Sequence, residues 1–360
     1  MATEMGPSGQ AASLEQLALH YVSDAEPGFS RRRAGKGFSY RDPQDRAMRE
    51  PQIISWIRSL AIPPAWTDVW ISPDRDGHLL ATGRDAKGRK QYRYHPRWRA
   101  AREETKFGRM LEFGRVLPRI RAAVDAELGR PGLGKEKALA TVVRLLEVTL
   151  IRVGNDEYAR LNRTFGLTTM RDRHFRAEGA SLRFSFRGKS GKRHVVTVRH
   201  RRLAGLVRRM QELPGQELFQ YVAEDGTPEP ITSGDVNAFL REVSGGDFTA
   251  KDFRTWAATV LAAWALSEFE RFDSQAAAKR NVTMAIERVA SRLGNTPAIC
   301  RKSYVHPEVV GAYLDGSLIE NLRREIEDEL RQELSGLEPE EVAVLLFLQR
   351  RLEAAEQEAA

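Results

Sequence analysis

The sequence predicts an α+β fold: a small N-terminal domain with an antiparallel β-sheet, then a larger, mainly α-helical domain containing a short β-hairpin sheet. Three observations support this. Strand-like runs between residues 66 and 95 are separated by Asp/Gly turns, helical apolar spacing dominates from Pro96 onward, and a short strand-like stretch interrupts the helices before residue 200. The predicted domains are residues 1–96, residues 97–317 and an acidic helical extension, 318–360.

The N-terminal elements follow from local signals. Residues 1–36 predict a flexible arm that leads into the basic cluster SRRRAGKG. PQIISWIRSL predicts a short amphipathic helix with Pro51 in its first turn. The runs WTDVWIS, HLLATGR and RKQYRYH are separated by the hairpin-type turns PDRDG and DAKG, which predicts an antiparallel meander.

The larger domain is expected to be helical on both sides of a β interlude. WRAAREETKFGRMLEFGRVLPRIRAAVDAEL and KEKALATVVRLLEVTLIRVGN predict long helices, the second ending at Gly154. FGLTTM, SLRFSFRG and KRHVVTVRH predict three strands, with a turn at GKSG. Further helices are expected at roughly 200–212, 233–243, 250–270, 274–293 and 297–305, and two more, broken at SGLEP, in 318–360.

The composition is that of a soluble globular protein, with 41% hydrophobic and 29% charged residues in 360. No apolar run approaches the roughly 18 to 20 residues that span a bilayer. The first residues lack the order of a signal peptide, so a cytoplasmic, nucleoid-associated location is expected. A single cysteine, Cys300, excludes an internal disulfide and a cysteine-based metal cage.

The charge is unevenly distributed. The net charge is +8, but residues 319–360 hold 12 acidic against 5 basic residues, which leaves +15 on residues 1–318. Such asymmetry favours a polyanionic partner. An arginine-rich proteome is an alternative explanation of the same composition.

Several kinds of chemistry lack their signature. The chain contains no glycine-rich phosphate loop with its lysine, and its seven histidines show no metal-ligand spacing. The acidic residues form no nuclease-like cluster. We therefore expect no nucleotide cofactor and no metal.

The stretch GNTPAICRKSYVHP contains the most prominent candidate, Tyr304, in a basic setting. Gly294 ends the preceding helical run, and Asn295 or Thr296 can cap a new helix that has Pro297 in its first turn. Tyr304 is then expected about two turns along that helix.

Four cations stand at other notable positions: Arg152, Lys189, Lys251 and Arg254. Each also has a structural explanation. Arg152 could cap a helix carboxyl end, Lys189 could be an ordinary turn lysine, and the Lys251–Arg254 pair could lie on a solvated helix face.

The strand RKQYRYH alternates basic or amide groups with aromatics, a pattern suited to DNA. Basic side chains bind phosphates, while Gln91, Tyr92 and Tyr94 could reach base edges or stack. The alternative is an edge strand whose charges prevent aggregation.

Taken in order, these residues resemble the active-site series of the type IB DNA topoisomerases, of the compact bacterial and poxvirus-like kind. The matching segments are IRVGNDEYARLN, FGLTTM, FSFRGKSGKRH, TAKDFRTW and LGNTPAICRKSYVHP, and IPPAW and GRKQYRYH resemble the small domain. The resemblance covers roughly residues 30 to 310. It implies a monomeric, C-shaped clamp around double-stranded DNA. The expected DNA-binding residues are Gln91, Tyr92, Tyr94, Tyr158, Lys192 and Arg193.

The resemblance also implies roles at the active site. Tyr304 would attack a phosphodiester to give a 3′-phosphotyrosyl bond, so that positive and negative supercoils relax without ATP or metal. Arg152 and Arg254 would stabilise the transition state. Lys189 would act as general acid, assisted by Lys251.

One position departs from the commoner pattern. Many family members carry a histidine where this chain has Asn295. An asparagine can donate a hydrogen bond to a phosphate oxygen but cannot carry a proton or a charge. We therefore expect oxyanion hydrogen bonding from Asn295, with plain helix capping as the alternative.

The residues alone leave two other functions open. A tyrosine site-specific recombinase or integrase shares the Arg, Lys, Arg and Tyr chemistry, but usually shows His-x-x-Arg, where this chain has Lys251-Asp-Phe-Arg254. The N-terminal domain of such a recombinase is typically helical, whereas this sequence predicts a β meander. A non-enzymatic DNA-binding protein would leave the ordered series of side chains as coincidence.

Overall fold

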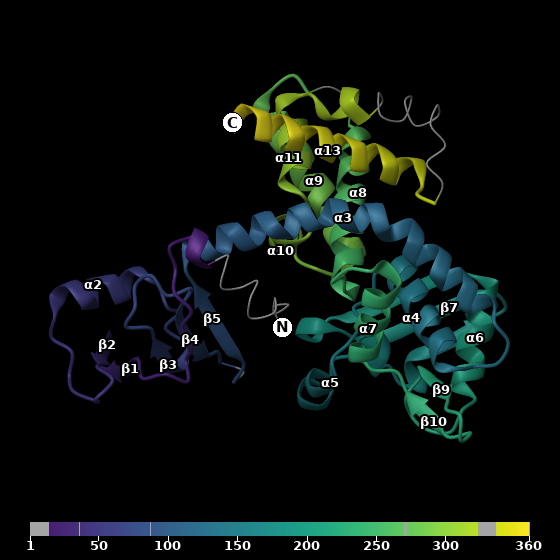
Figure 1. Cartoon of the computed structure of the whole chain (residues 1–360), viewed down its shortest axis with the longest axis horizontal. Coiled ribbons are helices and arrows are strands. Elements are labelled where there is room, and N and C mark those ends of the chain that lie inside the picture. The colour runs from purple at the N-terminus through teal and green to yellow at the C-terminus, as the bar shows by residue number, and fades with distance from the viewer. Residues whose placement is uncertain (1–13, 36, 87, 270–271, 323–335, 360) are drawn as a thin grey trace. The chain divides into compact units, whose positions relative to one another are not determined.

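The computed structural model describes residues 14–35, 37–86, 88–269, 272–322 and 336–359 (Figure 1). The chain forms two compact units, which divide between Phe107 and Gly108 inside one long helix, α3 (Pro96–Gly129). Antiparallel sheets and a helix-rich second unit confirm the predicted α+β class.

The N-terminal unit is built on a five-stranded antiparallel sheet in the order β2-β1-β3-β4-β5. Helix α2 (Pro51–Ser59) has Pro51 at its start, as predicted, and buries Ile57 against the sheet residues Val69, Ile71 and Ala81. The strands are β1 (Phe29–Ala34), β2 (Gly37–Arg41), β3 (Thr67–Ile71), β4 (Leu79–Arg84) and β5 (Lys90–Tyr94). The meander predicted for residues 66–95 is confirmed by β3, β4 and β5.

The basic cluster at residues 30–34 is a strand, so the prediction of a flexible arm through residue 36 was wrong for this part. Strand β1 lies inside the sheet, between β2 and β3. The guanidinium of Arg31 donates hydrogen bonds of 3.0 and 2.9 Å to the carbonyls of Ile62 and Pro63. These bonds satisfy loop carbonyls and fix the cluster to the sheet, an effect that composition alone does not reveal. Residues 1–13 lie outside the described residues.

The second unit is mainly helical. The helices predicted from the sequence agree with the structure to within about five residues. The first tail helix, predicted from residue 319, lies largely outside the described residues. The helices are α4 (Lys135–Thr149), α5 (Asp156–Asn162), α6 (Arg201–Gln211), α7 (Ser233–Ser244), α8 (Ala250–Ser267), α9 (Gln275–Leu293), α10 (Pro297–Ser303), α11 (Pro307–Asp315) and α13 (Pro339–Ala359). Of these, α5 and α11 were not predicted.

A three-stranded antiparallel sheet, β6-β7-β8, supplies the predicted β interlude. Its strands are β6 (Phe175–Glu178), β7 (Ser181–Arg187) and β8 (Arg193–Arg199), and the GKSG turn joins β7 to β8. The short pair β9 (Gln220–Val222) and β10 (Pro228–Pro230) was not predicted. The inner face of the sheet buries Leu182, Phe184 and Phe186 in the core.

Two local predictions in this unit were wrong. FGLTTM is not a strand: Leu167–Thr169 forms a 3₁₀ turn, because Thr168 donates its N–H to the Val153 carbonyl at 2.7 Å and not to a sheet. Helix α4 ends at Thr149 and not at Gly154, because Leu150 takes a left-handed conformation (φ 55°) and closes the helix five residues early.

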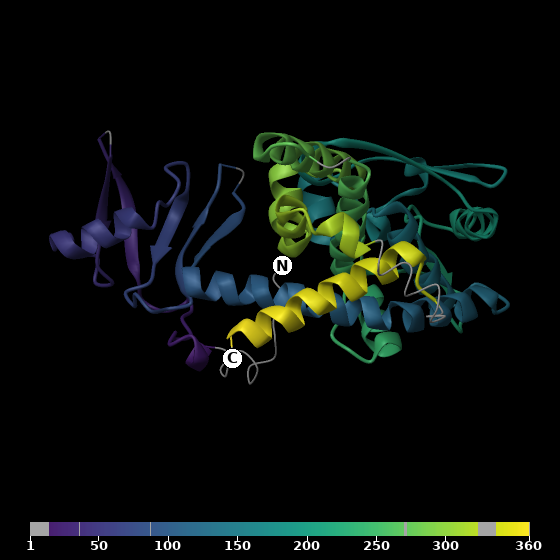
Figure 2. The ribbon, with the colours of Figure 1, turned by 90° about the horizontal axis from the view of Figure 1, so that it is seen from above.

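Helix α13 packs on α8 and beside α3 (Figure 2). Its residues Val344, Phe347 and Leu348 are fully buried in the core of the second unit. Glu341 accepts hydrogen bonds from Arg121 of α3 and, at 3.0 Å, from the indole N–H of Trp256 on α8. The C-terminal helix is therefore part of this core.

Among the described residues, no helix is both long and apolar enough to cross a membrane.

Candidate active site

Tyr304 stands at the end of a helix whose start is well defined. Gly294 ends α9 in the left-handed conformation (φ 65°), Thr296 caps α10 through its hydroxyl, and Pro297 opens the first turn. Tyr304 is the C-cap residue of α10 and is partly buried against the core. The two-turn helix predicted from the sequence is confirmed.

Arg254 is the cation that lies against the tyrosine. It is only 4% exposed, and its guanidinium carbon lies 5.4 Å from the centroid of the Tyr304 ring. One terminal nitrogen donates to the carbonyl of Leu150, and the other donates at 2.8 Å to Leu293. Both carbonyls belong to helix carboxyl ends, where a positive charge is favoured.

The charge of Arg254 persists despite its burial. Burial, together with the positive charge of nearby Arg152, lowers the pKa of its guanidinium to about 10. A pKa near 10 still leaves the group cationic at neutral pH. The site thus contains a desolvated positive charge directly beside a phenol, the arrangement that stabilises developing negative charge.

Arg152 reaches the site from the segment after α4. Its backbone is fixed because Leu167 donates its N–H to the Arg152 carbonyl at 2.9 Å. A side chain at Gly166 would lie 2.5 Å from that same carbonyl, so the close approach requires glycine there. The Arg152 guanidinium donates to the side-chain oxygen of Asn295. The structure therefore brings Arg152, Arg254, Asn295 and Tyr304 together.

Two buried donors in this group have no acceptor among the described residues: Arg254 Nε and Asn295 Nδ2. A buried donor without a partner costs on the order of 1–3 kcal/mol, and such groups are rare in native proteins. The side chains of Arg254 and Asn295 lie close enough to the Tyr304 hydroxyl to lower its pKa. An anionic ligand with oxygen acceptors, such as a phosphodiester, would satisfy both donors.

The electrostatic setting favours ionisation of Tyr304. Burial alone would raise the pKa of its hydroxyl, but the positive charges of Arg254 and Arg152 outweigh burial and hold the pKa below the usual value of 10. A phenolate is a far better nucleophile than a phenol.

Lys189 lines the same small hollow, of about 30 Å³, as Arg152 and Arg254. It is exposed on the turn between β7 and β8, where Gly188 donates its N–H to the Lys192 carbonyl at 2.8 Å. Lys251 differs. It is exposed on the first turn of α8, one turn before Arg254, and does not line the hollow.

His194 is a residue that the sequence reasoning missed. Its imidazole stacks on Phe186 at 5.3 Å and lies between two glycines: a side chain at Gly294 or Gly188 would come within 2.2 or 2.6 Å of the ring. These glycines directly precede Asn295 and Lys189. His194 therefore joins the loops that carry both residues. Its inward place in the alternating strand KRHVVTVRH was the available signal.

The surroundings of His194 favour the neutral form of its ring. Burial lowers the pKa of its imidazole, and the charges of Arg152, Arg254 and Lys192 lower it further. Its Nε2 is buried without a hydrogen-bond partner in the described part of the chain.

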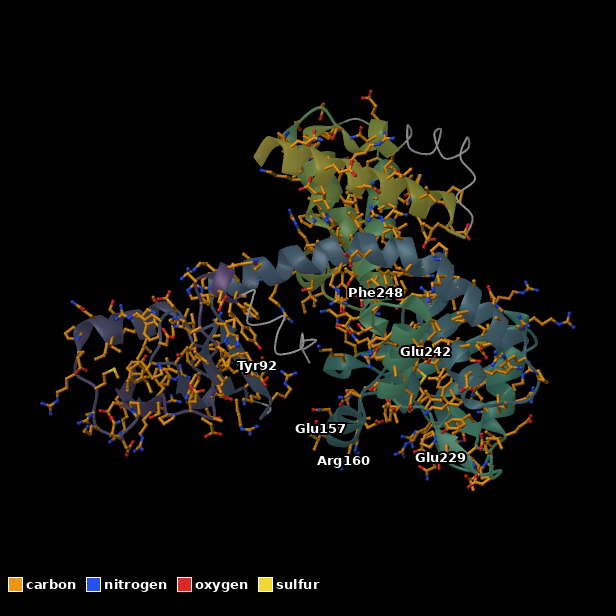
Figure 3. All side chains as sticks on the ribbon, viewed as in Figure 1. Tyr92, Glu157, Arg160, Glu229, Glu242 and Phe248 are labelled. Atoms are coloured by element: carbon orange, nitrogen blue, oxygen red, sulfur yellow. The ribbon has the colours of Figure 1, made fainter. Side chains whose placement is uncertain are left out.

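The expected DNA-binding residues are distributed over both units. On β5, Tyr92, which is labelled in Figure 3, is 47% exposed. Its ring stacks on that of Tyr94 with 5.9 Å between the ring centroids. Gln91 belongs to the opposite face of that strand and donates to Asp85 at 3.1 Å. Lys192 and Arg193 are exposed on the turn and start of β8. Tyr158 belongs to α5, but its side chain lies outside the described residues.

Comparisons with known proteins are consistent across both units. A family model described as eukaryotic DNA topoisomerase I, catalytic core, matches residues 95–346, and one described as bacterial DNA topoisomerase IB, N-terminal domain, matches residues 37–85. DNA topoisomerase 1B of Acanthamoeba polyphaga mimivirus is 32% identical over 285 residues, covering 77% of this chain and 85% of its own.

More distant relatives follow. DNA topoisomerase 1B of Vaccinia virus (strain Copenhagen) is 22% identical over 258 residues, covering 70% of this chain and 77% of its own. A solved structure of the XerH site-specific recombinase bound to palindromic difH substrate aligns at 14% identity and a TM-score of 0.34, over 53% of this chain and 47% of that chain. The latter likeness is too weak to argue from.

Proposed function

The chain belongs to the type IB DNA topoisomerase family, and on that basis we propose that it relaxes positive and negative supercoils in double-stranded DNA. It does so through a transient single-strand break, rotation of the free end and religation. Neither ATP nor a metal ion takes part. The protein acts as a monomer, in the cytoplasm at the nucleoid.

The chemical step begins at Tyr304. Its oxygen attacks the DNA phosphorus, so that the bond to the 5′ oxygen breaks and a 3′-phosphotyrosyl bond forms. Lys189 gives a proton to the leaving 5′ oxygen, assisted by Lys251. Because one phosphate ester replaces another, the bond energy is conserved. Religation is the reverse attack by the 5′ hydroxyl.

The transition state is stabilised by Arg152, Arg254 and Asn295. The observation that carries this proposal is the pair of buried donors without acceptors, Arg254 Nε and Asn295 Nδ2, beside a tyrosine whose pKa is lowered. The nonbridging oxygens of a phosphodiester would accept from both. The cations supply the charge neutralisation that Mg²⁺ supplies in other phosphoryl transfers.

DNA contacts outside the active site come from Gln91, Tyr92 and Tyr94 on β5, from Tyr158, and from Lys192 and Arg193 near the Lys189 turn. The functional domains proposed are residues 1–96 for DNA binding, 97–317 for catalysis and 318–360 for the acidic C-terminal part. Phosphate-dominated contacts make binding fall steeply with salt.

The test is relaxation of supercoiled plasmid in EDTA without ATP, run beside Tyr304→Phe. We expect complete relaxation of both positive and negative supercoils by the wild type, none by the variant, and a covalent DNA adduct only with the wild type. An absolute need for ATP or Mg²⁺, or an adduct that survives Tyr304→Phe, would contradict the proposal. Products that join two separate sites would favour a recombinase instead.

A further inference from the structure

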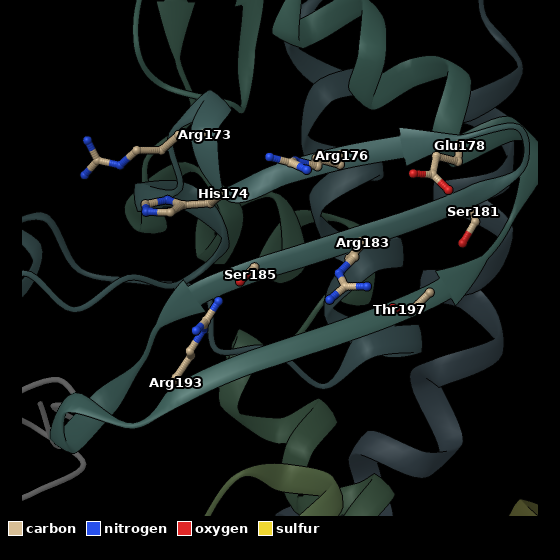
Figure 4. A pocket seen from close by; sticks show the side chains of 9 residues that line it. All are labelled: Arg173, His174, Arg176, Glu178, Ser181, Arg183, Ser185, Arg193 and Thr197. Atoms are coloured by element: carbon tan, nitrogen blue, oxygen red, sulfur yellow. The ribbon is translucent and has the colours of Figure 1, made fainter.

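His194 lies against the turn that carries Lys189, on the inner face of the β6-β7-β8 sheet. Successive residues of a strand point to opposite faces. The preceding residue, Arg193, lines a hollow of about 510 Å³ on the outer face of the sheet (Figure 4). The imidazole of His194 therefore points inward, where it stacks on Phe186 and lines the smaller hollow of the candidate site together with Lys189.

The contact between this ring and the turn is close. A Cβ atom at Gly188 would lie 2.6 Å from Cδ2 and 2.7 Å from Nε2 of the imidazole, so the ring packs on the backbone directly before Lys189. The turn itself is closed by the N–H of Gly191, which donates to the Gly188 carbonyl at 3.0 Å. The imidazole and the backbone from which the Lys189 side chain extends are thus held together.

The Nε2 atom of His194 is buried and has no hydrogen-bond partner among the described residues. An unpaired buried polar atom lowers stability, and a ring without nitrogen atoms would stack on Phe186 without that cost. The surroundings favour the neutral imidazole, because burial and nearby positive charges lower its pKa. A neutral imidazole has one nitrogen that donates and one that accepts, so the ring has an unused acceptor.

The ammonium of Lys189 lacks an acceptor. It has three N–H donors but no hydrogen bond or ion pair within the described part of the chain. The hydroxyl of Thr149, which also lines the hollow, is already engaged, because it donates to the Leu145 carbonyl and accepts from the N–H of Ile151. The remaining polar side chains of the lining are donors only: Arg152, Arg254 and Arg292. Among the side chains of this lining, His194 therefore supplies the unused acceptor.

We propose that His194 is a positioning residue for the general acid: its Nε2 accepts a hydrogen bond from the Lys189 ammonium and directs a second N–H of that group toward the leaving 5′ oxygen. This inference rests on the proposed function, in which Lys189 protonates that oxygen. As the bond from Tyr304 to phosphorus forms and the bond to the 5′ oxygen breaks, one proton passes from Lys189 Nζ to that oxygen and leaves a neutral amine. His194 neither gains nor loses a proton.

A neutral acceptor suits this task. A carboxylate in the same place would hold the ammonium by opposite charge and favour its protonated form, which opposes transfer of the proton. An imidazole without charge orients the ammonium and leaves it able to act as an acid.

The experiment compares two DNA substrates in single-turnover cleavage by the full-length protein. Both carry the same site, mapped beforehand with the wild type, but one has the ordinary 5′ oxygen at the scissile phosphate and the other has a bridging sulfur. A thiol is a far stronger acid than an alcohol, so a thiolate leaves without a proton and the sulfur substrate needs no general acid. The test variant is His194→Phe, which keeps a stacked ring and removes the acceptor.

We expect His194→Phe to slow cleavage of the oxygen substrate by about tenfold to a hundredfold, a part of the roughly 10²–10⁴ that a general acid contributes. The sulfur substrate should lose less than about threefold, which also shows that the variant is folded. His194→Leu, whose smaller side chain fits between the glycines, should give the same pattern. Adding His194→Phe to Lys189→Ala should cause less than about twofold further loss on the oxygen substrate, because the group to be positioned is absent.

Two controls define the extremes of this comparison. Lys189→Ala should be slowed on the oxygen substrate alone. Asn295→Ala should be slowed on both substrates, because its amide serves the nonbridging oxygens, which are the same in each.

The outcomes distinguish the two proposals. If the wild type cleaves neither substrate, or if Lys189→Ala is not slowed on the oxygen substrate, the proposed function or its general acid fails. If those results hold but His194→Phe and His194→Leu cleave the oxygen substrate at the wild-type rate, the positioning role is overturned. Equal slowing of both substrates by these variants would also overturn it, as would a full further loss when His194→Phe is added to Lys189→Ala.

Discussion

The hydroxyl of Thr259 on α8 donates a hydrogen bond of 3.1 Å to the backbone carbonyl of Tyr304. The same oxygen accepts a bond of 3.0 Å from the N–H of His306, so one buried side chain fixes the backbone at and after Tyr304. Thr259 shares its helix with Arg254. The tyrosine and its neighbouring cation are thus held by one rigid element, and small displacements of reacting groups reduce rates steeply.

Thr259→Val keeps the shape of this residue but removes both bonds. We expect cleavage to slow by about tenfold, equivalent to about 1.4 kcal/mol, and the free energy of unfolding to fall by about 1–2 kcal/mol. Single-turnover formation of the covalent adduct and urea denaturation measure the two effects. The control is Thr283→Val on α9, an exposed threonine that bonds within its own helix. Equal rates for the two variants would show that Thr259 positions nothing.

The ionisation of Tyr304 should appear in the pH dependence of cleavage. Its pKa lies below 10 because Arg254 and Arg152 outweigh the effect of burial. The single-turnover rate should therefore rise with pH and level off below pH 10. In Arg152→Gln the rate should be lower and the rising limb should move to higher pH. A limb that stays in place in this variant would mean that another group is titrating.

The role of Asn295, whose side-chain oxygen accepts a bond from Arg152, can be tested by substitution. Asn295→Ala should slow cleavage by about 10²-fold, the typical cost of one lost oxyanion donor. Asn295→Asp should be worse, because a carboxylate beside Arg152 repels the phosphate and raises the pKa of Tyr304. Asn295→His should recover at least part of the alanine loss. If alanine cleaves as fast as the wild type, Asn295 serves the fold alone.

His194 should contribute to a pH-dependent loss of stability. Its folded-state pKa lies below the unfolded value of 6.5, so the unfolded chain binds the proton more readily. This stability is fully present above pH 6.5 and is lost as the pH falls below it. We expect acidification to destabilise the wild type more than His194→Phe, which keeps the ring stacked on Phe186. Urea denaturation at neutral and acidic pH measures the difference. An equal loss of unfolding free energy in the wild type and in His194→Phe would exclude this role.

The attachment of α13 rests on a partly buried network. Arg121 bonds to Glu341 and Glu147, and this pairing outweighs burial to raise the pKa of its guanidinium. Glu341→Gln should lower the free energy of unfolding by about 3 kcal/mol, because it leaves Arg121 undercompensated. Glu353→Gln, on the exposed part of the same helix, should change it by less than about 0.5 kcal/mol. Similar denaturation curves for both variants would contradict the assignment.

The sequence predicted elements well wherever one local signal decided the outcome. Gly294 as a helix end, Pro51 and Pro297 at helix starts, and the Asp/Gly hairpin turns all act within a few residues. The errors came from long-range partners. Leu150 ends α4 in a left-handed conformation, which is usually adopted by glycine. The residues around Arg31, predicted as a flexible arm, form a strand, and Arg31 bonds to a loop some 30 residues away.

The candidate site shows the same division. Spaced motifs pointed to Arg152, Arg254, Asn295 and Tyr304, which the structure brings together. Nothing in the motifs pointed to Thr259, and His194 was indicated only by its inward place in an alternating strand, because each acts through contacts with a distant element. Their importance depends on the fold being assembled, and composition and spacing carry no record of that contact.

The packing of α13 also determines when the core can be completed during synthesis of the chain. Translation proceeds from the N-terminus, so Tyr304 and the other residues of the candidate site emerge before residues 344–348, which complete the core around Trp256. Until then a nascent chain already contains Tyr304 but still exposes the apolar stripe of α8, the kind of surface that chaperones and proteases recognise. We therefore expect a chain that ends before residue 339 to be degraded before it can cleave DNA.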